Sequence, residues 1–330
     1  MNTDFLIQDY LPHASWSIGG GLLHGHTMLQ LSEGIAKEMQ GIRSLSCLHV
    51  TPACAWTVDW SAQRAMTTPT AYLRLLGLTD AQKLPVCLNF DNPFVAKAML
   101  EDGFGLFLVD ELLRHNPTGL NCAAVADDRV AFVLRRQFPR LPLIAHMNRS
   151  VVEEGEPDAD FYNRLLEVYD RVQLYPGSLR RADVVQALKA PERCMVVVND
   201  LCRRGSRSAH SELLLLLAQM RMRPYDFNYK VRRSELMAAL LAPVGIQGNT
   251  LTRAELASLY AQGLRSFHLQ AEQYKNALTP AWVLMSYLLT ADPQYSNKTS
   301  LLIYKVLSYL NGAPPPLASG LEPFTLRLPE

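Results

Sequence analysis

The stretch GLNCAAVADDRVAFVLRRQFPRLPLIAHMN, residues 119–148, carries the pattern that decides the fold. Its apolar runs at 120–124 and 143–147 do not alternate with polar residues, which is typical of strands covered on both faces. Between them, residues 128–138 repeat apolar side chains at spacings of three and four, as an amphipathic helix does. The stretch therefore predicts a strand, a helix and a second strand that runs parallel to the first.

The same unit recurs along most of the chain. Helices are also expected at 158–169, after Ser178 and after Thr250, where Glu255 lies a little beyond the ideal capping-box offset. About eight units in a row, without an early GxGxxG motif, favour an α/β fold of the (β/α)8 TIM-like barrel type over an open sheet. The further strands are predicted at 45–50, 86–90, 106–109, 172–175, 195–199, 244–247 and 266–269.

Two segments flank the repeated units. The segment SWSIGGGLLHGHT, residues 15–27, is interpreted as a Gly-rich loop before a helix that starts near Met28, suited to cradle an anion beside His24 and His26. After residue 272 the pattern changes to two helical segments and a Pro-rich tail. We therefore expect a barrel over 1–272 and a C-terminal helical extension over 273–330.

Composition limits the class of protein. The chain has 330 residues, 48% of them hydrophobic, and 32 basic against 31 acidic side chains. This balance argues against a protein that mainly coats nucleic acid, although it leaves a local basic patch open. No apolar run has the length of a membrane span and no signal-peptide pattern is present, so a cytoplasmic location is expected. Six cysteines without a CxxC pair predict reduced thiols.

Polar side chains follow most predicted strands, and in a barrel the C-terminal strand ends surround the active-site mouth. These residues are the candidates for binding a small-molecule or peptide substrate. They are Asn89, Asp110, Asn148, Tyr175, Asn199 and Gln247.

Reactive side chains concentrate in MVVVNDLCRRGSRSAH, residues 195–210. Asp200, Cys202, His146 and His210 are the catalytic candidates, with Cys202 as a thiol nucleophile beside an imidazole. His146, Asp200, Cys202 and His268 are also suited to bind one divalent zinc or iron ion. The alternative is structural: His146 bonds a neighbouring carbonyl and Cys202 is a small packed residue.

The segments LNFDN, residues 119–151, YDRVQLYPGSL and VVVNDLCRRGSRSAH resemble the collagenase-like peptidase family of unassigned catalytic type, the U32 family. The resemblance covers a little over half of the chain. It implies a barrel, with relatives that include peptidases and oxygen-independent hydroxylases of RNA bases or quinone precursors. Some relatives hold an iron–sulfur cluster on four cysteines. Here only Cys202 matches, and Ser206 stands where a second cysteine is expected, so a four-cysteine cluster is not predicted.

These observations favour a barrel enzyme that acts on a small polar metabolite or modified peptide, by metal-assisted hydrolysis or hydroxylation. One alternative is a non-catalytic subunit or binding module of a biosynthetic complex, docked through the C-terminal helices. Another is an RNA base-modifying enzyme. The basic groups available for RNA are the arginine pairs at 135–136, 180–181, 203–204 and 232–233.

Overall fold

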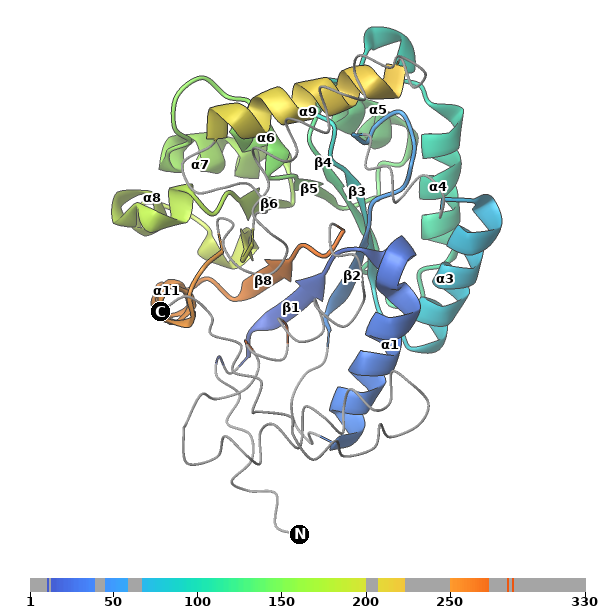
Figure 1. Ribbon diagram of the computed structural model, residues 1–330, viewed down its shortest axis with the longest axis horizontal. Helices are drawn as coiled ribbons and strands as arrows, with labels where there is room; N and C mark the ends of the chain where they lie inside the picture. Colours follow the sequence, from blue (N-terminus) through green and yellow to red (C-terminus); the bar gives the residue numbers. More distant parts are fainter. Residues whose placement is uncertain are drawn as a thin grey trace, which may run out of the picture.

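The computed structural model describes residues 11, 13–38, 45–58, 67–199, 207–222, 250–272, 284 and 287. In this part of the chain eight parallel strands close into a barrel in chain order (Figure 1). Strand β8 closes the barrel by pairing with β1, from Ser15 opposite Ser266 to Ile18 opposite Leu269. The predicted (β/α)8 barrel is confirmed. Its strands are β1 (Ser15–Ile18), β2 (Cys47–Val50), β3 (Val86–Phe90), β4 (Cys122–Val125), β5 (Leu143–Ala145), β6 (Arg171–Leu174), β7 (Cys194–Val197) and β8 (Ser266–Leu269).

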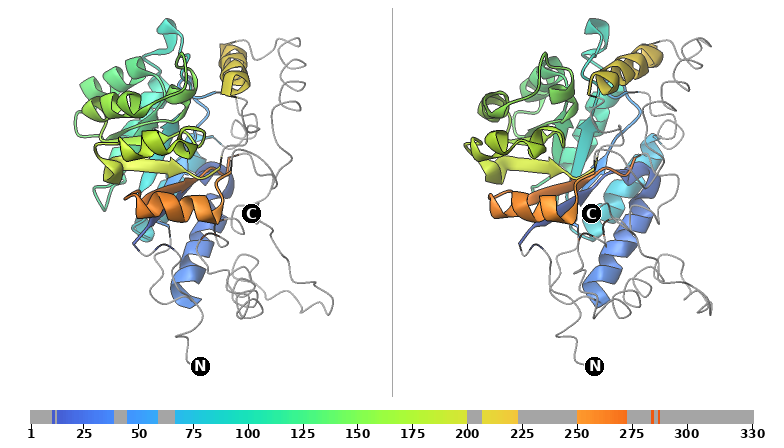
Figure 2. Two further views of the ribbon diagram at one scale, coloured as in Figure 1. Left: turned by 90° about the vertical axis from the view of Figure 1, so that its left-hand side faces the viewer. Right: turned by 60° about the vertical axis from the view of Figure 1, so that its left-hand side comes forward.

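Helices surround the barrel (Figure 2). The helix predicted after Thr250 begins two residues later than expected, because the Thr252 side chain caps it and Glu255 completes a capping box. The α-helices are α1 (Gly21–Glu38), α3 (Pro69–Ala81), α4 (Gly103–Arg114), α5 (Asp128–Gln137), α6 (Asn148–Val151), α7 (Ala159–Val168), α8 (Ala182–Gln186), α9 (Arg207–Met222) and α11 (Arg253–Ala261). Three 3-10 turns are η1 (Lys97–Met99), η2 (Ser178–Arg180) and η3 (Pro191–Arg193).

Two predictions about elements are wrong. Residues 106–109 belong to α4, because Gly105, Leu108, Val109 and Leu112 form one buried helical face that follows the N-cap Asp102. The segment at 15–18, interpreted as loop, is strand β1, and α1 begins at Gly21 rather than near Met28. The strand predicted at 244–247 lies outside the described residues.

Three clusters of buried side chains make up the described core, and two of them form layers of the barrel itself. The larger layer lies between strands and helices, and it includes Trp16, whose ring stacks on Phe267 at 5.0 Å and on Tyr287 at 5.6 Å. Leu284 and Tyr287, from the predicted 273–330 extension, are buried in this layer. The smaller layer fills the barrel interior with Cys87, Ala124, Ile144 and Met195. The domain boundary at 272 stays a prediction.

Candidate functional site

Alternation along the strands places several polar side chains inside the barrel. Register pairs join His49 to Cys87, Asn89 to Ala124 and Val197 to His268. Inward-facing residues of neighbouring parallel strands are register partners, so these side chains share the interior. His49, Asn89 and His268 are at most 3% exposed, and each lies toward the C-terminal end of its strand.

His49 and His268 stack with ring centroids 4.1 Å apart. Nδ1 of His49 lies 2.9 Å from Oδ1 of Asn89, which only accepts, so Nδ1 carries the proton and Nε2 keeps a lone pair. That buried Nε2 has no hydrogen-bond partner within the described ranges. Nδ1 of His268 lies 3.0 Å from the hydroxyl of Ser17.

A second polar group follows β5. The backbone N–H of Asn148 donates to Nδ1 of His146 at 3.2 Å, which leaves the proton of the neutral ring on Nε2. The Asn148 side chain donates from Nδ2 to the carbonyl of Asp91 at 2.8 Å. Its Oδ1 is buried, and no described residue bonds it. The mouth therefore presents an amide oxygen ready to accept a hydrogen bond.

Burial keeps these imidazoles neutral. It lowers the pKa of His146 to about 3, with smaller contributions from the charges of His49 and His210. Burial also lowers the pKa of His49 and holds the pKa of His268 well below its ordinary value. At neutral pH the interior therefore holds imidazole rings that accept or donate hydrogen bonds without carrying charge.

Glu272, which sequence reasoning missed, places a carboxyl group at the end of β1. Its Oε1 accepts from the hydroxyl of Thr51 at 3.1 Å, and its Oε2 accepts from the N–H of Ala271 at 3.0 Å. Burial raises the pKa of this carboxyl, and hydrogen bonds from backbone N–H groups, that of Gly20 included, partly oppose the rise. A Cβ on Gly19 would lie 2.4 Å from Oε1, so the carboxylate keeps this position only when residue 19 is glycine. The predicted Gly-rich anion cradle thus holds the chain's own carboxylate.

A chain of hydrogen bonds joins Glu272 to the interior histidine. Nδ2 of Asn89 donates to Oγ1 of Thr51 at 3.3 Å, and Asn89 Oδ1 accepts from His49. The order is therefore His49 on β2, Asn89 on β3, Thr51 directly after β2 and Glu272 in the segment after β8. No sequence motif marks this set, because its members meet only when the barrel closes.

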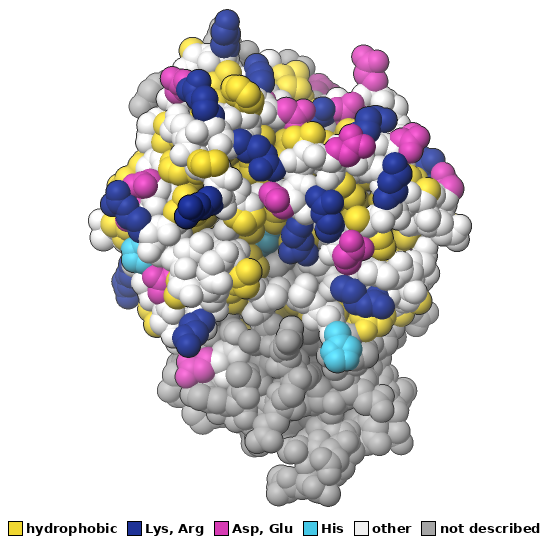
Figure 3. All heavy atoms as spheres, turned by 180° about the vertical axis from the view of Figure 1, so that it is seen from behind, with side chains coloured by type: hydrophobic (Ala, Val, Ile, Leu, Met, Phe, Trp, Pro, Cys, Tyr) yellow, Lys and Arg dark blue, Asp and Glu magenta, His cyan; other side chains and the backbone are white. Residues whose placement is uncertain are grey.

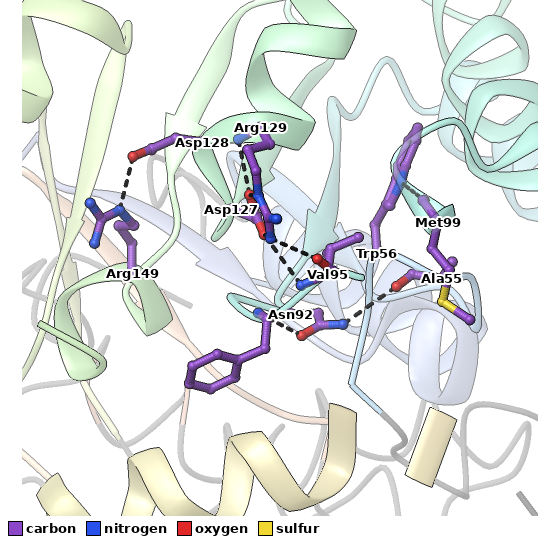
Figure 4. Close-up of polar contacts among 10 residues, drawn as sticks. Ala55, Trp56, Asn92, Val95, Met99, Asp127, Asp128, Arg129 and Arg149 are labelled. Atoms are coloured by element: carbon purple, nitrogen blue, oxygen red, sulfur yellow. Dashed lines mark hydrogen bonds and ion pairs between the residues drawn. The ribbon is translucent and has the colours of Figure 1, made fainter. Parts of the chain in front are cut away.

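Loops after β2, β3 and β4 are tied together at the rim (Figure 4). The indole of Trp56 donates to the carbonyl of Met99 at 3.0 Å, and the Asn92 side chain donates to the carbonyl of Ala55 at 3.4 Å. Asp127 accepts from the N–H of Val95 at 3.2 Å and pairs with Arg129 at 2.6 Å. These bonds hold the rim in one arrangement.

Helix α9 covers another part of the mouth. Its Leu214 and Leu217 pack in one apolar cluster with Met147, Tyr175 and Val197, from the ends of β5, β6 and β7 (Figure 1). The same helix carries His210, which is 5% exposed and near enough to His146 for their charges to interact. Two of the four catalytic candidates, His146 and His210, are therefore close enough for their charges to interact.

The other predicted residues have different surroundings. Asn199 uses its side chain to brace the end of β8, with Nδ2 donating to the carbonyl of Gln270 at 2.9 Å and Oδ1 accepting from the Gln270 N–H at 2.7 Å. Asp110 lies on α4, where it pairs with Arg114 at 2.6 Å. The segment that was expected to be a strand ending at Asp110 is part of this helix, so the reason for placing Asp110 at the mouth is lost. Asp200, Cys202 and Gln247 lie outside the described residues.

Metal binding by the predicted set stays a prediction. Within the ranges that the structure describes, no group of three or more His, Cys, Asp or Glu side chains is arranged to hold a metal ion. Two of the four predicted ligands, Asp200 and Cys202, are outside those ranges. The zinc or iron site on His146, Asp200, Cys202 and His268 therefore needs a measurement.

The described arginine pairs do not form a free basic patch. Arg135 pairs with Asp170 at 3.4 Å, Arg136 with Glu101 at 3.1 Å, Arg180 with Glu255 at 3.0 Å and Arg181 with Asp183 at 2.7 Å. On the face shown in Figure 3, basic and acidic side chains are interspersed. The pairs at 203–204 and 232–233 lie outside the described residues. Among the described helices, none is long and apolar enough to cross a membrane.

Comparison with known proteins gives a likeness in fold. No protein-family model matches the sequence, and no curated protein matches it. One similar solved structure is that of the U32 peptidase Mk0906, with a TM-score of 0.48 and 13% sequence identity. The alignment covers 78% of this chain and 92% of that one. At this identity the likeness concerns the barrel and not the chemistry.

Proposed function

We propose that the chain is an enzyme that binds a small polar molecule or modified peptide at the C-terminal mouth and acts on it by hydrolase-type acid–base chemistry. The observation that carries the proposal is the buried Oδ1 of Asn148, which no described residue bonds, beside the neutral ring of His146. A buried acceptor without a partner costs about 1–3 kcal/mol. A substrate N–H or O–H at this position would remove that cost.

The mouth supplies two further groups with complementary roles. The Nε2–H of His146 is suited to donate a hydrogen bond to a substrate oxygen on which negative charge develops. The carboxyl of Glu272, whose pKa is raised by burial, is suited to act as a general acid or base. In the metal-assisted form of this proposal, a zinc or iron ion would be bound by His146, Asp200, Cys202 and His268. Metal analysis of the purified protein tests this form.

The experiment compares three full-length proteins on a panel of short peptides, small amides and small esters, with products read by mass spectrometry. His146→Gln should lower turnover by about a hundredfold or more, because it replaces the donor ring. Asp110→Asn is the matched control, since this residue lies on α4, where it pairs with Arg114. Unchanged turnover in His146→Gln, or no turnover of any compound by the wild-type protein, refutes the proposal.

A further inference from the structure

A cavity of about 330 Å³ opens at the N-terminal end of the barrel, opposite the mouth. Its walls are formed by the first residues of several strands, among them Cys47, Cys122, Arg171 and Ser266, and it reaches inward to His49. Barrel interiors are usually filled by bulky branched side chains. Here serine and cysteine side chains occupy many of the interior positions at the N-terminal ends of the strands, and the cavity between them is not filled by protein atoms.

Three thiols meet beside this cavity. Cys47, Cys87 and Cys122 lie on β2, β3 and β4, and all three are free. The Cys122 sulfur lies within interaction range of the thiols of Cys47 and Cys87, which donate to the carbonyls of Leu48 at 3.9 Å and Leu88 at 3.8 Å. Cys87 and Cys122 are register partners on adjacent strands. Adjacent strands lie about 4.8 Å apart, within the Cα separation that a disulfide requires.

The surroundings make Cys122 the reactive member of the group. Hydrogen bonds from Cys47 and Cys87 hold the pKa of the Cys122 thiol well below its ordinary value, and the charge of Arg171 acts in the same direction. The pKa values of the Cys47 and Cys87 thiols are raised. Of the three thiols, Cys122 is the one that loses its proton most readily.

We propose that Cys122 and Cys87 form a peroxide-reactive dithiol at the N-terminal pole, served by this cavity and separate from the mouth. Hydrogen peroxide fits the volume, and the partnerless Nε2 of His49, which lines the cavity, is an acceptor for a peroxide O–H.

The reaction balances in two steps. The Cys122 thiolate attacks one peroxide oxygen, the O–O bond breaks, and the other oxygen leaves as hydroxide and takes up a proton to become water. The Cys87 sulfur then attacks the sulfenic sulfur of Cys122, loses its proton and expels a second water. Two thiols lose two electrons in total, and one peroxide is reduced to two waters.

Peptide mapping of the wild-type, full-length protein tests the proposal. The reduced protein is exposed to hydrogen peroxide, its remaining thiols are alkylated, and its peptides are identified by mass spectrometry. We expect a linked pair of Cys87 and Cys122 peptides, lighter by two hydrogen atoms. It should form at least about tenfold faster than any oxidation of Cys54 or Cys194, which are buried elsewhere in the core.

Two variants identify the order of the steps. In Cys87→Ser the reaction should stop at the Cys122 sulfenic acid, which dimedone traps. Cys194→Ser is the matched control, because it removes a buried thiol that lies outside the group, so the link should still form. Oxidation of Cys122 no faster than that of Cys194, or a link from Cys122 to another cysteine, overturns the proposal. Even if a variant fails to fold, peptide mapping of the wild-type protein shows whether the link between Cys87 and Cys122 forms.

Discussion

Replacing Gly19 with alanine should displace the Glu272 carboxylate from the end of β1. The new methyl group would lie 2.4 Å from Oε1 and 2.5 Å from Oε2, far inside an ordinary contact of about 3.5–4.0 Å. The side chain of Glu272 is flexible enough to move away. It would then lose its hydrogen bonds to the Thr51 hydroxyl, at 3.1 Å, and to the Ala271 N–H, at 3.0 Å.

The size of the effect follows from opposing contributions. Hydrogen bonds to a charged group are worth about 1.5–3 kcal/mol each, but the displaced carboxylate regains hydration. Replacing glycine also reduces the entropy of the unfolded chain, which stabilises the protein by about 0.4–1 kcal/mol. We therefore expect Gly19→Ala to lower the free energy of unfolding by about 1–2 kcal/mol.

A double-mutant cycle in urea, followed by tryptophan fluorescence, measures this effect. In the Glu272→Ala background the cost of Gly19→Ala should almost vanish, which gives a coupling energy of about 1–2 kcal/mol. Gly77→Ala is the matched control, because a Cβ there, in the middle of α3, meets no atom within 4 Å. It should stabilise by up to about 1 kcal/mol. An equal cost of Gly19→Ala in both backgrounds would refute the assigned contact.

Three further predictions concern stability. Between pH 6.5 and about pH 3 the unfolded chain binds a proton that folded His146 does not, so this residue alone should lower the free energy of unfolding by about 1.4 kcal/mol per pH unit as the pH falls below 6.5. The lowered pKa values of His49 and His268 act in the same direction. Urea unfolding at about pH 7 and about pH 5 checks the direction. Thr252→Ala removes the capping bond to the Glu255 N–H and should cost about 1 kcal/mol by the same assay. Gly105→Ala places a methyl 2.7 Å from the Trp56 ring and should cost about 1–3 kcal/mol, visible as a lower thermal midpoint.

The sequence predicts strands well where both faces are covered by apolar neighbours. The bounds of β3 and β8 agree with the prediction, and α5 ends one residue earlier than expected. A four-residue apolar run such as 106–109 cannot distinguish a strand from one face of a helix, because both periodicities fit so short a window. Strand β1 was missed because its SWSI sequence has serines that face the interior, which made it look like a loop.

Only part of the site could be predicted from the sequence, and the reason is geometric. His146 and His268 could be named from their places at strand ends. His49 and Glu272 could not, because their roles depend on register across the closure of the barrel and on contacts between distant segments. Asp110 was misplaced together with its strand. The sequence pattern indicates which side chains follow a strand, but only the closed sheet determines which of them are in contact.

Strand β2 and the residue directly after it, Thr51, contribute side chains to both ends of the barrel. Cys47, His49 and Thr51 alternate toward the interior. Cys47 reaches the thiol group at the N-terminal pole, His49 stacks on His268 at the centre, and Thr51 donates to Glu272 at the mouth. The outward-facing Leu48 and Val50 belong to the large apolar layer under the helices. Because that outer layer supplies most of the buried apolar surface, the interior can carry polar groups without loss of the fold.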